Sequence, residues 1–462
     1  DRTVFGFYTT DRLSMGHARL TIRGQESGFQ PVLGNGTALV YNGEIYNTQE
    51  IERRLGQSFE SDTITLDAAL NKFGIGIVSD LEGEFAFAYY TQNTLYLARD
   101  ALGVKPLYYF ASPRRVVFAS ELKALIPRLA EPPTLYPLDT QSYVKPYGNY
   151  TPIAQIKQVL PGHYLECTQN AGEIRIREHR YHSFQNQPVI QDPVHAREKL
   201  KATLYDCTRR MMISDTKMGI LLSGGVDSAI LAQAASQHAP YTLNAYCVGT
   251  SEQNEFEFAQ EIADHNGLHL RTIELTADEI AGTLETVIQK TETYDAGILP
   301  TAIAMNKLFE PIREKAVLSG EGPDELFGGY AECFDIHHQA DPDYEHFGRQ
   351  IRTATANMYQ RQLARLDKIS LSYAIEARVP FLHKRFVETA LAIDPRLKYK
   401  TGSSKAILRE AFADRVPQRI RTMPKKRFGP AAGITTRYPD LQAHAKTVFE
   451  TYVNQLHQEG KT

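Results

Sequence analysis

Hydrophobic positions change their spacing near residue 184, and the change divides the chain into two parts. The first part contains short alternating apolar runs, at 38–41, 85–90 and 116–119. Turn formers such as those at 34–36 and 42–43 separate these runs, which predicts antiparallel strands. Two stretches with helical spacing, Thr48–Leu55 and Thr65–Phe73, interrupt them. We therefore expect a layered α+β sandwich in the first part.

In the second part, short apolar strands alternate with segments of helix length. The expected strands are Lys217–Leu222, Leu243–Val248, Leu270–Leu275 and, as the last of them, Ala316–Leu318. The expected helices between them are Asp227–Gln237, Glu255–Asn266 and Ala277–Lys290. This alternation is typical of βαβ units and predicts an α/β, doubly wound parallel sheet. A mostly helical part follows from about Asp341. Because the polar stretch Ser183–Pro188 resembles a linker, we place the domains at 1–184 and 185–462.

Composition excludes several classes of protein. The hydrophobic and charged contents, 42% and 23%, are ordinary for a globular chain. A net charge of −3 gives no electrostatic reason to bind nucleic acid, and no apolar run reaches the roughly 18 residues of a membrane span. The four cysteines lie far apart, at Cys167, Cys207, Cys247 and Cys333. This spacing argues against a zinc site or a disulfide framework, and it fits a reducing cytoplasm.

The most informative motif follows the strand expected at 217–222. Residues 223–228 read Ser-Gly-Gly-Val-Asp-Ser and lead into a helix. Glycines bring backbone N–H groups close to a ligand, and a helix N-terminus favours an anion. The Walker motif is absent, so the lysine that usually reaches a γ-phosphate is missing. The turn is therefore interpreted as a phosphate-binding turn rather than an ordinary strand-to-helix connection. It predicts an enzyme that binds pyrophosphate and transfers AMP to a carboxylate.

A second glycine-rich turn, at 319–329, follows the strand Ala316–Leu318. Alone it is compatible with a solvated acidic loop. Because ligands of doubly wound sheets lie at the carboxyl ends of the strands, we expect the two turns to meet. Asp227 and Asp324 then suit Mg²⁺, which prefers one or two carboxylates together with phosphate oxygens. Glu321 would accept a proton from an attacking amine.

Three further features allow two interpretations each. Lys405 precedes a helix, and it is either a surface lysine or a cation that stabilises charge on the leaving pyrophosphate. The basic run at 421–428 is either solvated or covers the site. Asn42-Gly43 is by itself a common hairpin signal. The 14 histidines show no spacing typical of metal ligands.

Taken together, these motifs resemble the glutamine-hydrolysing asparagine synthetase family. The resemblance rests on Asn-Gly-Glu-Ile-Tyr-Asn at 42–47, Arg-Asp-x-x-Gly at 99–103, the turns at 223–228 and 319–330, and Ala-Ile-Glu-Ala-Arg-Val-Pro-Phe-Leu at 374–382. It implies an N-terminal αββα glutaminase domain whose ammonia passes internally to a PP-loop synthetase domain. That second domain would use ATP and Mg²⁺ to adenylate a carboxylate such as aspartate, and ammonia would displace AMP.

The resemblance also implies a role for individual residues. Glutamine would contact Arg19, Asn42, Gly43, Glu44 and Asp62, with Asn42 and Gly43 in the oxyanion hole. ATP would contact Leu222, Ser223, Gly224, Gly225, Asp227, Ser228, Val248, Ser319 and Gly320. Mg²⁺ would bind Asp227 and Asp324, Glu321 would act as the base on ammonia, and Lys405 would serve the transition state.

Two departures from the family pattern keep alternatives open. The family's nucleophile is an N-terminal cysteine, whereas this sequence begins with Asp1, so we expect about 30 further residues before it. If the nucleophile is truly lost, a catalytically silent nucleotide-binding protein is the alternative. The segment Asn254–Ala259 resembles that of β-lactam and carbapenam synthetases, which use the substrate's own amine. Those relatives carry a tyrosine in place of Glu321, so the expected function is a glutamine-dependent amide synthetase. A cytoplasmic homodimer is the expected setting.

Overall fold

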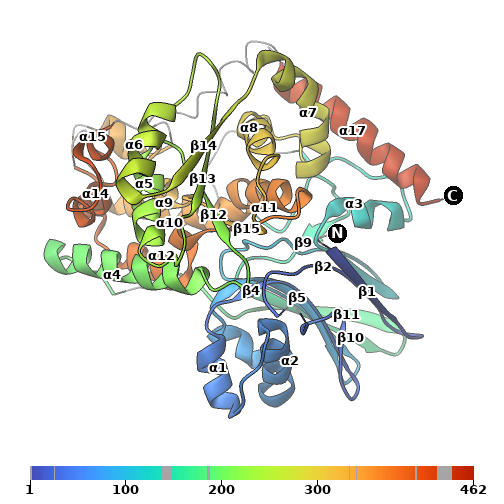
Figure 1. Cartoon of the computed structure of the whole chain (residues 1–462). Helices are drawn as coiled ribbons and strands as arrows, with labels where there is room; N and C mark the ends of the chain where they lie inside the picture. Colours follow the sequence, from blue (N-terminus) through green and yellow to red (C-terminus); the bar gives the residue numbers. More distant parts are fainter. Residues whose placement is uncertain are drawn as a thin grey trace.

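The computed structural model describes residues 3–24, 26–137, 148–184, 188–331, 333–339, 341–400, 403–423 and 440–461. An N-terminal half of antiparallel sheets lies against a C-terminal half built on a parallel sheet (Figure 1). The mixed architecture expected from the sequence is thus confirmed. Residues 185–187 of the expected linker lie outside the described residues, so the boundary between domains stays a prediction.

The described residues of the N-terminal half form three sheets. Its strands are β1 Thr3–Thr9, β2 Ser14–Leu20, β3 Val32–Leu33, β4 Thr37–Ile45, β5 Gly83–Thr91, β6 Thr94–Arg99, β7 Tyr108–Ser112, β8 Arg115–Ala119, β9 Lys157–Gln158, β10 His163–Asn170 and β11 Glu173–Arg180. The largest sheet has the order β11-β10-β6-β5-β4-β3, and the smaller ones are β8-β7-β9 and β1-β2. The helical elements are α1 Thr48–Leu55, α2 Asp62–Phe73, η1 Ile75–Asp80, α3 Leu122–Leu125 and η2 Ile126–Arg128.

Strand β4 is buried on both faces, which places it at the centre of this half. Leu39 and Tyr41 belong to the core that packs beneath α1 and α2. Ala38 and Val40 point the other way, into a second core shared with residues of β7 and β2. Because side chains alternate along a strand, the alternating apolar run at 38–41 supplies both cores at once. The central strand therefore carries the candidate residues 42–44 between two packed layers.

The hairpin interpretation of Asn42-Gly43 is wrong. Both residues lie inside β4, where Gly43 is paired with Phe85 of the antiparallel neighbour β5. Gly43 has a φ of 137°, and a Cβ atom there would lie 1.9 Å from the backbone oxygen of Glu84. Glycine is needed here because two strands approach closely and because the backbone adopts a conformation that other residues avoid.

The C-terminal half contains a five-stranded parallel sheet with the order β14-β13-β12-β15-β16. Its strands are β12 Met218–Leu221, β13 Asn244–Gly249, β14 His269–Glu274, β15 Ala316–Leu318 and β16 Glu376–Arg378. The helical elements are α4 Pro193–Met211, α5 Val226–Ser236, α6 Phe256–Asn266, α7 Ala277–Thr291, α8 Leu299–Phe309, α9 Pro323–Phe327, η3 Asp335–His338, α10 Tyr344–Asn357, η4 Met358–Gln360, α11 Gln362–Ser372, η5 Pro380–Leu382, α12 Lys384–Ala392, α13 Pro395–Lys398, α14 Ala406–Ala411, α15 Gln418–Thr422 and α17 Leu441–Glu459.

The expected alternation of strands and helices is confirmed, but Ala316–Leu318 is not the last strand. Strand β16, within the part expected to be helical, joins the sheet beside β15. Its Glu376 and Arg378 are buried, 6% and 0% exposed, and they form an ion pair of 2.7 Å. A buried strand with two charged residues out of three has no apolar signature, because its charges are compensated by each other and by the distant partners Lys105 and Glu44.

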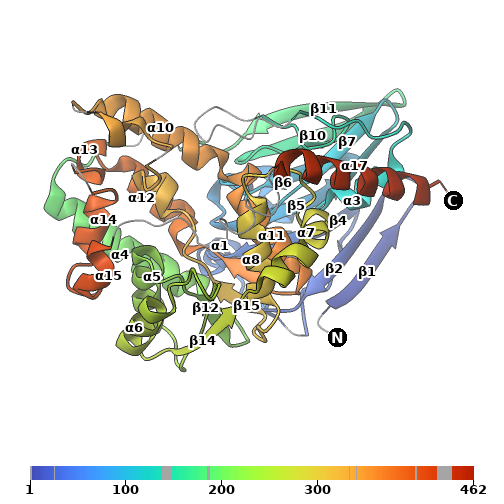
Figure 2. The same cartoon turned by 90° about the horizontal axis from the view of Figure 1, so that it is seen from above.

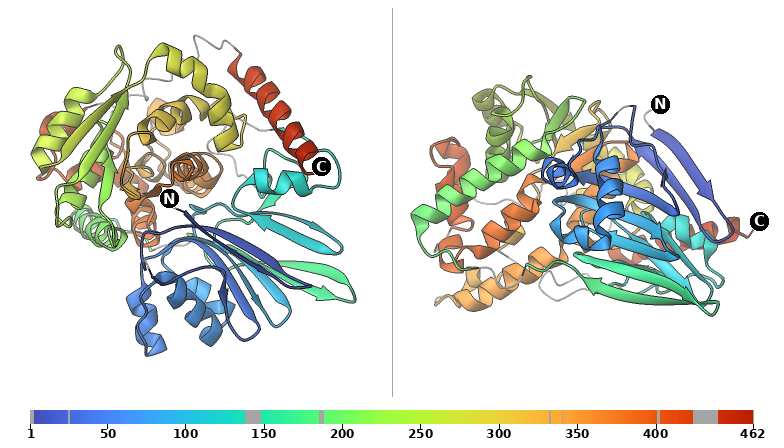
Figure 3. Two further views of the ribbon diagram at one scale, coloured as in Figure 1. Left: turned by 45° about the vertical axis from the view of Figure 1, so that its right-hand side comes forward. Right: turned by 90° about the horizontal axis from the view of Figure 1, so that it is seen from below.

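The two halves are closely joined. Helix α17 packs against both α7 and η2, so the C-terminal helix spans the junction (Figures 2 and 3). Lys105 of the N-terminal half forms a buried ion pair of 3.0 Å with Asp367 of α11. Within the described ranges, no helix is long and apolar enough to cross a membrane.

Candidate active sites

The glycine-rich turn after β12 leads directly into helix α5. The helix begins at Val226, and its N-cap is Gly225, which has no side chain to occupy the first free N–H groups. The Ser228 hydroxyl closes the turn by accepting from Ser223 N at 3.2 Å and donating to Gly225 O at 3.0 Å. Free N–H groups and a positive helix end favour an anion. The local geometry therefore suits the phosphate site predicted from the sequence.

The acidic turn after β15 lies against the first turn. Strands β12 and β15 are paired in parallel, so both turns leave the same edge of the sheet. A Cβ atom on Gly320 would lie 3.4 Å from Ser228 N, which measures how closely the two turns approach. Ser319 N donates to Arg378 O at 2.8 Å, so β16 supports the turn from the other side. The expected meeting of the two turns is thus found in the structure.

Lys405 links the two aspartates that the sequence assigns to Mg²⁺. Its ammonium lies 2.5 Å from Asp227 Oδ2 and 2.6 Å from Asp324 Oδ1. Lys405 is 1% exposed, so its interpretation as a surface lysine is wrong. Lys405 precedes α14 and has a φ of 58°, a left-handed backbone conformation. This conformation directs its side chain into the site rather than along the helix. A buried cation between two carboxylates thus lies beside the turn that the sequence predicts to bind phosphate.

The two aspartates fit a magnesium ion that is completed by phosphate oxygens. Asp227 Oδ1 is buried and, within the described part of the chain, accepts no hydrogen bond. The described residues contain no cluster of three or more His, Cys, Asp or Glu side chains that would hold a metal without a substrate. Mg²⁺ usually takes one or two carboxylates plus phosphates. The donor set therefore matches Mg²⁺ bound together with ATP.

Glu321 is held by a residue that the sequence analysis missed. Arg365 of α11 donates to Glu321 Oε1 at 2.5 Å. Glu325 lies in the first turn of α9, two residues after Pro323, and is buried. Burial, together with the charges of Asp324 and Glu321, raises the pKa of Glu325 to about 8. Gln362 donates to its Oε1 at 2.8 Å. Glu325 belongs to the predicted turn, whereas no local signal marks Arg365 or Gln362.

The remaining ATP-site candidates lie at adjacent strand ends. Leu222 N donates to Tyr246 O at 2.8 Å, which joins the ends of β12 and β13, and Val248 is buried on β13. A Cβ on Gly224 would lie 2.6 Å from the Cβ of Phe258, so the segment Asn254–Ala259 packs on the phosphate turn through α6. Of the basic run at 421–428, residues 424–428 lie outside the described residues.

In the N-terminal half, Arg19 of β2 is buried with an unused donor. Its Nη2 donates to Arg23 O at 2.8 Å and to Gly24 O at 2.7 Å, while the buried Nη1 has no hydrogen-bond partner among the described residues. A Cβ on Gly28 would lie 3.2 Å from Arg19 Nη2, so glycine leaves room beside the guanidinium. The charges of Asp62 and Glu44 act on Arg19, which places the three groups in one region. An unsatisfied buried guanidinium suits a carboxylate ligand.

Asp62 is fixed by three donors. Its Oδ2 accepts from the Tyr41 hydroxyl at 2.7 Å and from Ile45 N at 3.1 Å, and its Oδ1 accepts from Thr63 N at 2.9 Å. Ser61 caps α2, so this helix begins at Asp62 rather than at Thr65 as expected. The bond from Tyr41 was not anticipated, because it joins a strand to a helix N-terminus.

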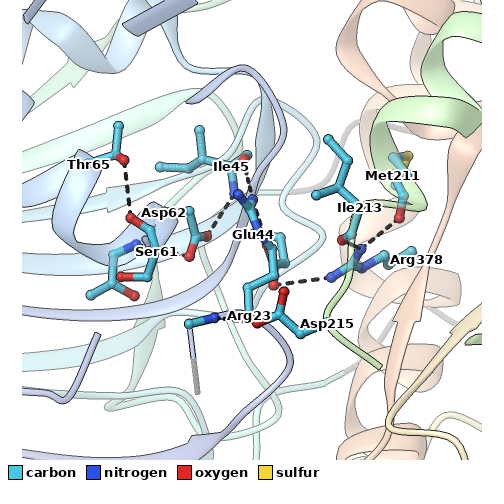
Figure 4. A network of polar contacts seen from close by, with 12 residues as sticks. Arg23, Glu44, Ile45, Ser61, Asp62, Thr65, Met211, Ile213, Asp215 and Arg378 are labelled. Atoms are coloured by element: carbon cyan, nitrogen blue, oxygen red, sulfur yellow. Dashed lines mark hydrogen bonds and ion pairs between the residues drawn. The ribbon is translucent and has the colours of Figure 1, made fainter. Parts of the chain in front are cut away.

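Glu44 connects the two halves of the molecule (Figure 4). Its carboxylate lies 3.1 Å from Arg378 Nη2 of the C-terminal half and 3.5 Å from Arg23 Nη1. Arg378 also donates to the carbonyls of Met211 and Ile213, at 2.6 and 2.8 Å. Burial and the charge of Asp62 raise the pKa of Glu44 against the opposing effect of Arg378. The string at 374–382, one of those that carry the family resemblance, includes Arg378 but gave it no role.

Comparisons with known proteins match two family models to this chain. The family model described as a glutamine amidotransferase domain matches residues 3–182, and the model described as asparagine synthase matches residues 199–342 and 335–459. Asparagine synthetase B (glutamine-hydrolysing) of Escherichia coli K12 is 30% identical over 93% of this chain and 76% of its own length. The asparagine synthetase of Brassica oleracea is 26% identical over 95% of this chain and 74% of its own. A probable asparagine synthetase of Schizosaccharomyces pombe is 30% identical, covering 90% and 76%. The chain belongs to the glutamine-hydrolysing asparagine synthetase family.

Proposed function

We propose that this protein forms an amide from a carboxylic acid and ammonia at the expense of ATP, with release of AMP and pyrophosphate, and that glutamine supplies the ammonia. The observation that carries the proposal is the buried Asp227–Lys405–Asp324 arrangement beside the free N-terminus of α5. The relatives named above are asparagine synthetases, which makes aspartate the proposed acid.

The first step is adenylation of the acid. An oxygen of the substrate carboxylate attacks the α-phosphorus of ATP, the bond to the β-phosphate oxygen breaks, and pyrophosphate leaves. The turn at 223–225 and the first N–H groups of α5 bind the leaving pyrophosphate. Lys405 stabilises the negative charge that develops on the leaving pyrophosphate. Its ammonium already lies beside the turn, so the side chain does not have to move during the reaction. Asp227 and Asp324 would hold Mg²⁺, which neutralises phosphate charge when bound.

The second step is attack by ammonia on the acyl carbon. The acyl–oxygen bond breaks, AMP departs with the electron pair, and one proton of the nitrogen passes to Glu321. Arg365 holds Glu321 Oε1 in the turn after β15, which leaves the second carboxylate oxygen for the proton. A positioned base typically contributes 10²- to 10⁴-fold to a rate.

The N-terminal half binds glutamine and releases ammonia. Arg19, with its unused Nη1, takes the α-carboxylate. Glu44 and Asp62 take the amino group, since two buried carboxyl groups suit one cation. Asn42 and Gly43 stabilise the oxyanion that forms when the amide is attacked. The domain limits 1–184 and 185–462, the cytoplasmic location and a homodimeric assembly stay predictions.

One experiment tests the synthetase part directly. With ATP, Mg²⁺, ammonium chloride and aspartate, we expect AMP and pyrophosphate in equal amounts with the amide. Glu321→Gln should lower amide formation about 10²-fold or more, while exchange of labelled pyrophosphate into ATP continues, because the base acts only in the second step. Asp67→Asn, far from this turn on α2, is the matched control.

Production of ADP and phosphate would contradict the proposal, and unchanged amide synthesis in Glu321→Gln would remove the role given to Glu321. Replacing aspartate and ammonia with other acids and amines tests the second candidate, an enzyme of a specialised pathway. The packing of Phe258 and Glu255 on Gly224 favours that candidate, because it places a segment similar to the ring-forming relatives against the phosphate turn.

A further inference from the structure

The ammonium of Lys405 lies where a metal ion shared by Asp227 and Asp324 would lie. It is 2.5 Å from one carboxylate and 2.6 Å from the other, and the side chain is 1% exposed. The same two carboxylates are the ones that the proposed function assigns to Mg²⁺. The lysine and the metal ion therefore compete for the same oxygen atoms.

Backbone atoms enclose the contact between Lys405 and Asp324. A Cβ atom on Gly329 would lie 1.8 Å from Asp324 Oδ1 and 2.4 Å from Lys405 Cε, so glycine is needed where the chain passes this pair. Gly329 N also donates to Asp324 O at 2.7 Å, which holds the turn around the carboxylate. Because the backbone packs directly on the pair, a metal ion with its water shell has to displace the ammonium in order to enter on this side.

The positive charges near the two aspartates already balance them. Lys405 supplies one positive charge in direct contact with both carboxylates. The charges of Asp227 and Asp324 also act on the guanidinium of Arg409, which belongs to the helix that Lys405 precedes. Among the described residues, these two cations match the two aspartates in number.

The neighbouring glutamates add little negative charge to the site. Glu321 is paired with Arg365 at 2.5 Å. Burial, together with the charges of Asp324 and Glu321, raises the pKa of Glu325 to about 8, so that this carboxyl is mostly uncharged at pH 7. Without nucleotide, the site therefore has little electrostatic attraction for a free divalent cation.

ATP changes this balance, because its phosphates bring negative charge and further oxygen ligands. Phosphate oxygens give the ammonium of Lys405 another acceptor, and they supply the ligands that Mg²⁺ prefers beside one or two carboxylates. Asp227 Oδ1 is buried and accepts no hydrogen bond in the described part of the chain, whereas Oδ2 contacts Lys405. One oxygen of this carboxylate is thus available to a metal ion that arrives with the phosphates.

We propose that Lys405 excludes free divalent cations from the synthetase site until ATP binds, by taking the place of the metal ion between Asp227 and Asp324. The inference rests on the proposed function, from which it takes the two magnesium ligands, and it adds an order of binding. Lys405 then neutralises the aspartates before ATP binds and the phosphates afterwards. Without Lys405, two buried carboxylates remain close together, an arrangement that is costly unless a cation binds to them.

Binding of Mn²⁺ to the whole protein without nucleotide tests the inference. The electron paramagnetic resonance signal of hydrated Mn²⁺ decreases when the ion binds to protein, which gives the dissociation constant. Lys405→Met keeps the length of the side chain and removes its charge, so it should bind one Mn²⁺ per chain about 100-fold more tightly than the wild type. The double variant Lys405→Met/Asp227→Asn should lose this tight binding, because one of the two carboxylates is gone.

Lys398→Met is the matched control. Lys398 is also 1% exposed, but it donates to the backbone oxygen of Leu326 rather than to a carboxylate. This variant should bind Mn²⁺ as weakly as the wild type does.

Thermal unfolding of the wild type gives a second measurement that needs no variant. Mg²⁺ alone should leave the Tm unchanged, whereas Mg²⁺ with ATP should raise it above the value with ATP alone, since a ligand stabilises the state that binds it.

Equal Mn²⁺ affinities in the wild type and Lys405→Met would overturn the inference. Tight binding that persists in the double variant, or that also occurs in Lys398→Met, would overturn it as well, because the ion would then lie elsewhere. The same holds if Mg²⁺ alone raises the wild-type Tm as much as Mg²⁺ with ATP. The proposed function is measured separately, as AMP and pyrophosphate formed with aspartate and ammonium chloride. If these products are absent while Mn²⁺ binds as expected, the proposed function fails and the exclusion of free metal by Lys405 stands.

Discussion

The two candidate sites compensate their buried charges in different ways. In the synthetase site, Asp227 and Asp324 share one cation, Lys405, which belongs to the same half of the molecule. In the proposed glutamine site, Glu44 lies 3.5 Å from Arg23 of its own half and 3.1 Å from Arg378 of the other half. The charges of the first site are therefore compensated within its own sheet and helices. Those of the second are compensated partly across the junction, so we expect glutamine binding to depend on contact between the two halves.

The largest effect is expected from Lys405→Ala, which tests the self-contained site. The substitution leaves two buried carboxylates without their cation and removes the charge that meets the leaving pyrophosphate. We expect the adenylation rate to fall by about 10²- to 10⁴-fold, measured as exchange of labelled pyrophosphate into ATP. Glutamine hydrolysis should change little. A comparable loss of glutamine hydrolysis would contradict the distinction between the sites, because it would mean that their buried charges are not compensated separately.

Arg378→Met tests the shared site and is expected to affect stability first. Arg378 is fully buried, and its removal takes the nearest cation from Glu44 and Glu376, which then keep only Arg23 at 3.5 Å and Lys105 at 4.0 Å. Breaking a buried ion pair by removing one partner typically costs about 3–5 kcal/mol. We expect this loss in urea unfolding, together with faster hydrogen exchange in β4, although the substituted residue lies in the other half.

The double variant Glu44→Gln/Arg378→Met separates the ion pair from simple loss of packing. Neutralising Glu44 should restore part of the stability lost in Arg378→Met, because the uncompensated charge is then removed. If the losses in unfolding free energy of the two single substitutions simply add, Arg378 does not compensate the charge of Glu44, and the distinction between the sites is wrong.

Glu84→Gln is expected to change the pH dependence of stability rather than an activity. Glu84 has a pKa raised from its ordinary 4.5 to about 8, so the native state binds more protons than the unfolded state between these values. Stability contributed by the neutral carboxyl is complete below pH 4.5 and is lost as the pH rises towards 8. The difference in unfolding free energy, Glu84→Gln minus wild type, should therefore increase from pH 5 to pH 8. A flat difference would show that Glu84 ionises normally.

The glycine-rich turns could be predicted from the sequence, since their chemistry depends on local backbone. The tight turn at 223–225 and the uncapped first turn of α5 follow from glycines placed between a strand and a helix, and the meeting of two such turns follows from the geometry of parallel strands. The sequence identified Lys405 as a candidate residue but did not predict where its side chain lies. Its burial depends on a left-handed backbone conformation before α14 and on two aspartates from distant turns.

Other features had no local signal. Asn42-Gly43 has the form of a hairpin turn, yet it lies in a central strand, because the close approach of β5 calls for a glycine. Strand β16 has a polar pattern, yet it is buried, because Lys105 and Glu44 from the other half compensate its charges. The Tyr41–Asp62 bond and the Arg365–Glu321 bond join segments whose proximity only the folded chain creates.

The two glycine-rich turns, the alternation of strands and helices, and the types of residue available for chemistry all follow from the amino-acid sequence, because each depends on local backbone preferences and on the spacing of side chains. Which charges are buried, and which partner compensates each of them, depends on the folded chain. Desolvation and Coulomb interactions depend on distance in space rather than on separation along the chain. The ion pair of Glu44 with Arg378 and the raised pKa of Glu84 therefore arise only where the two halves are in contact.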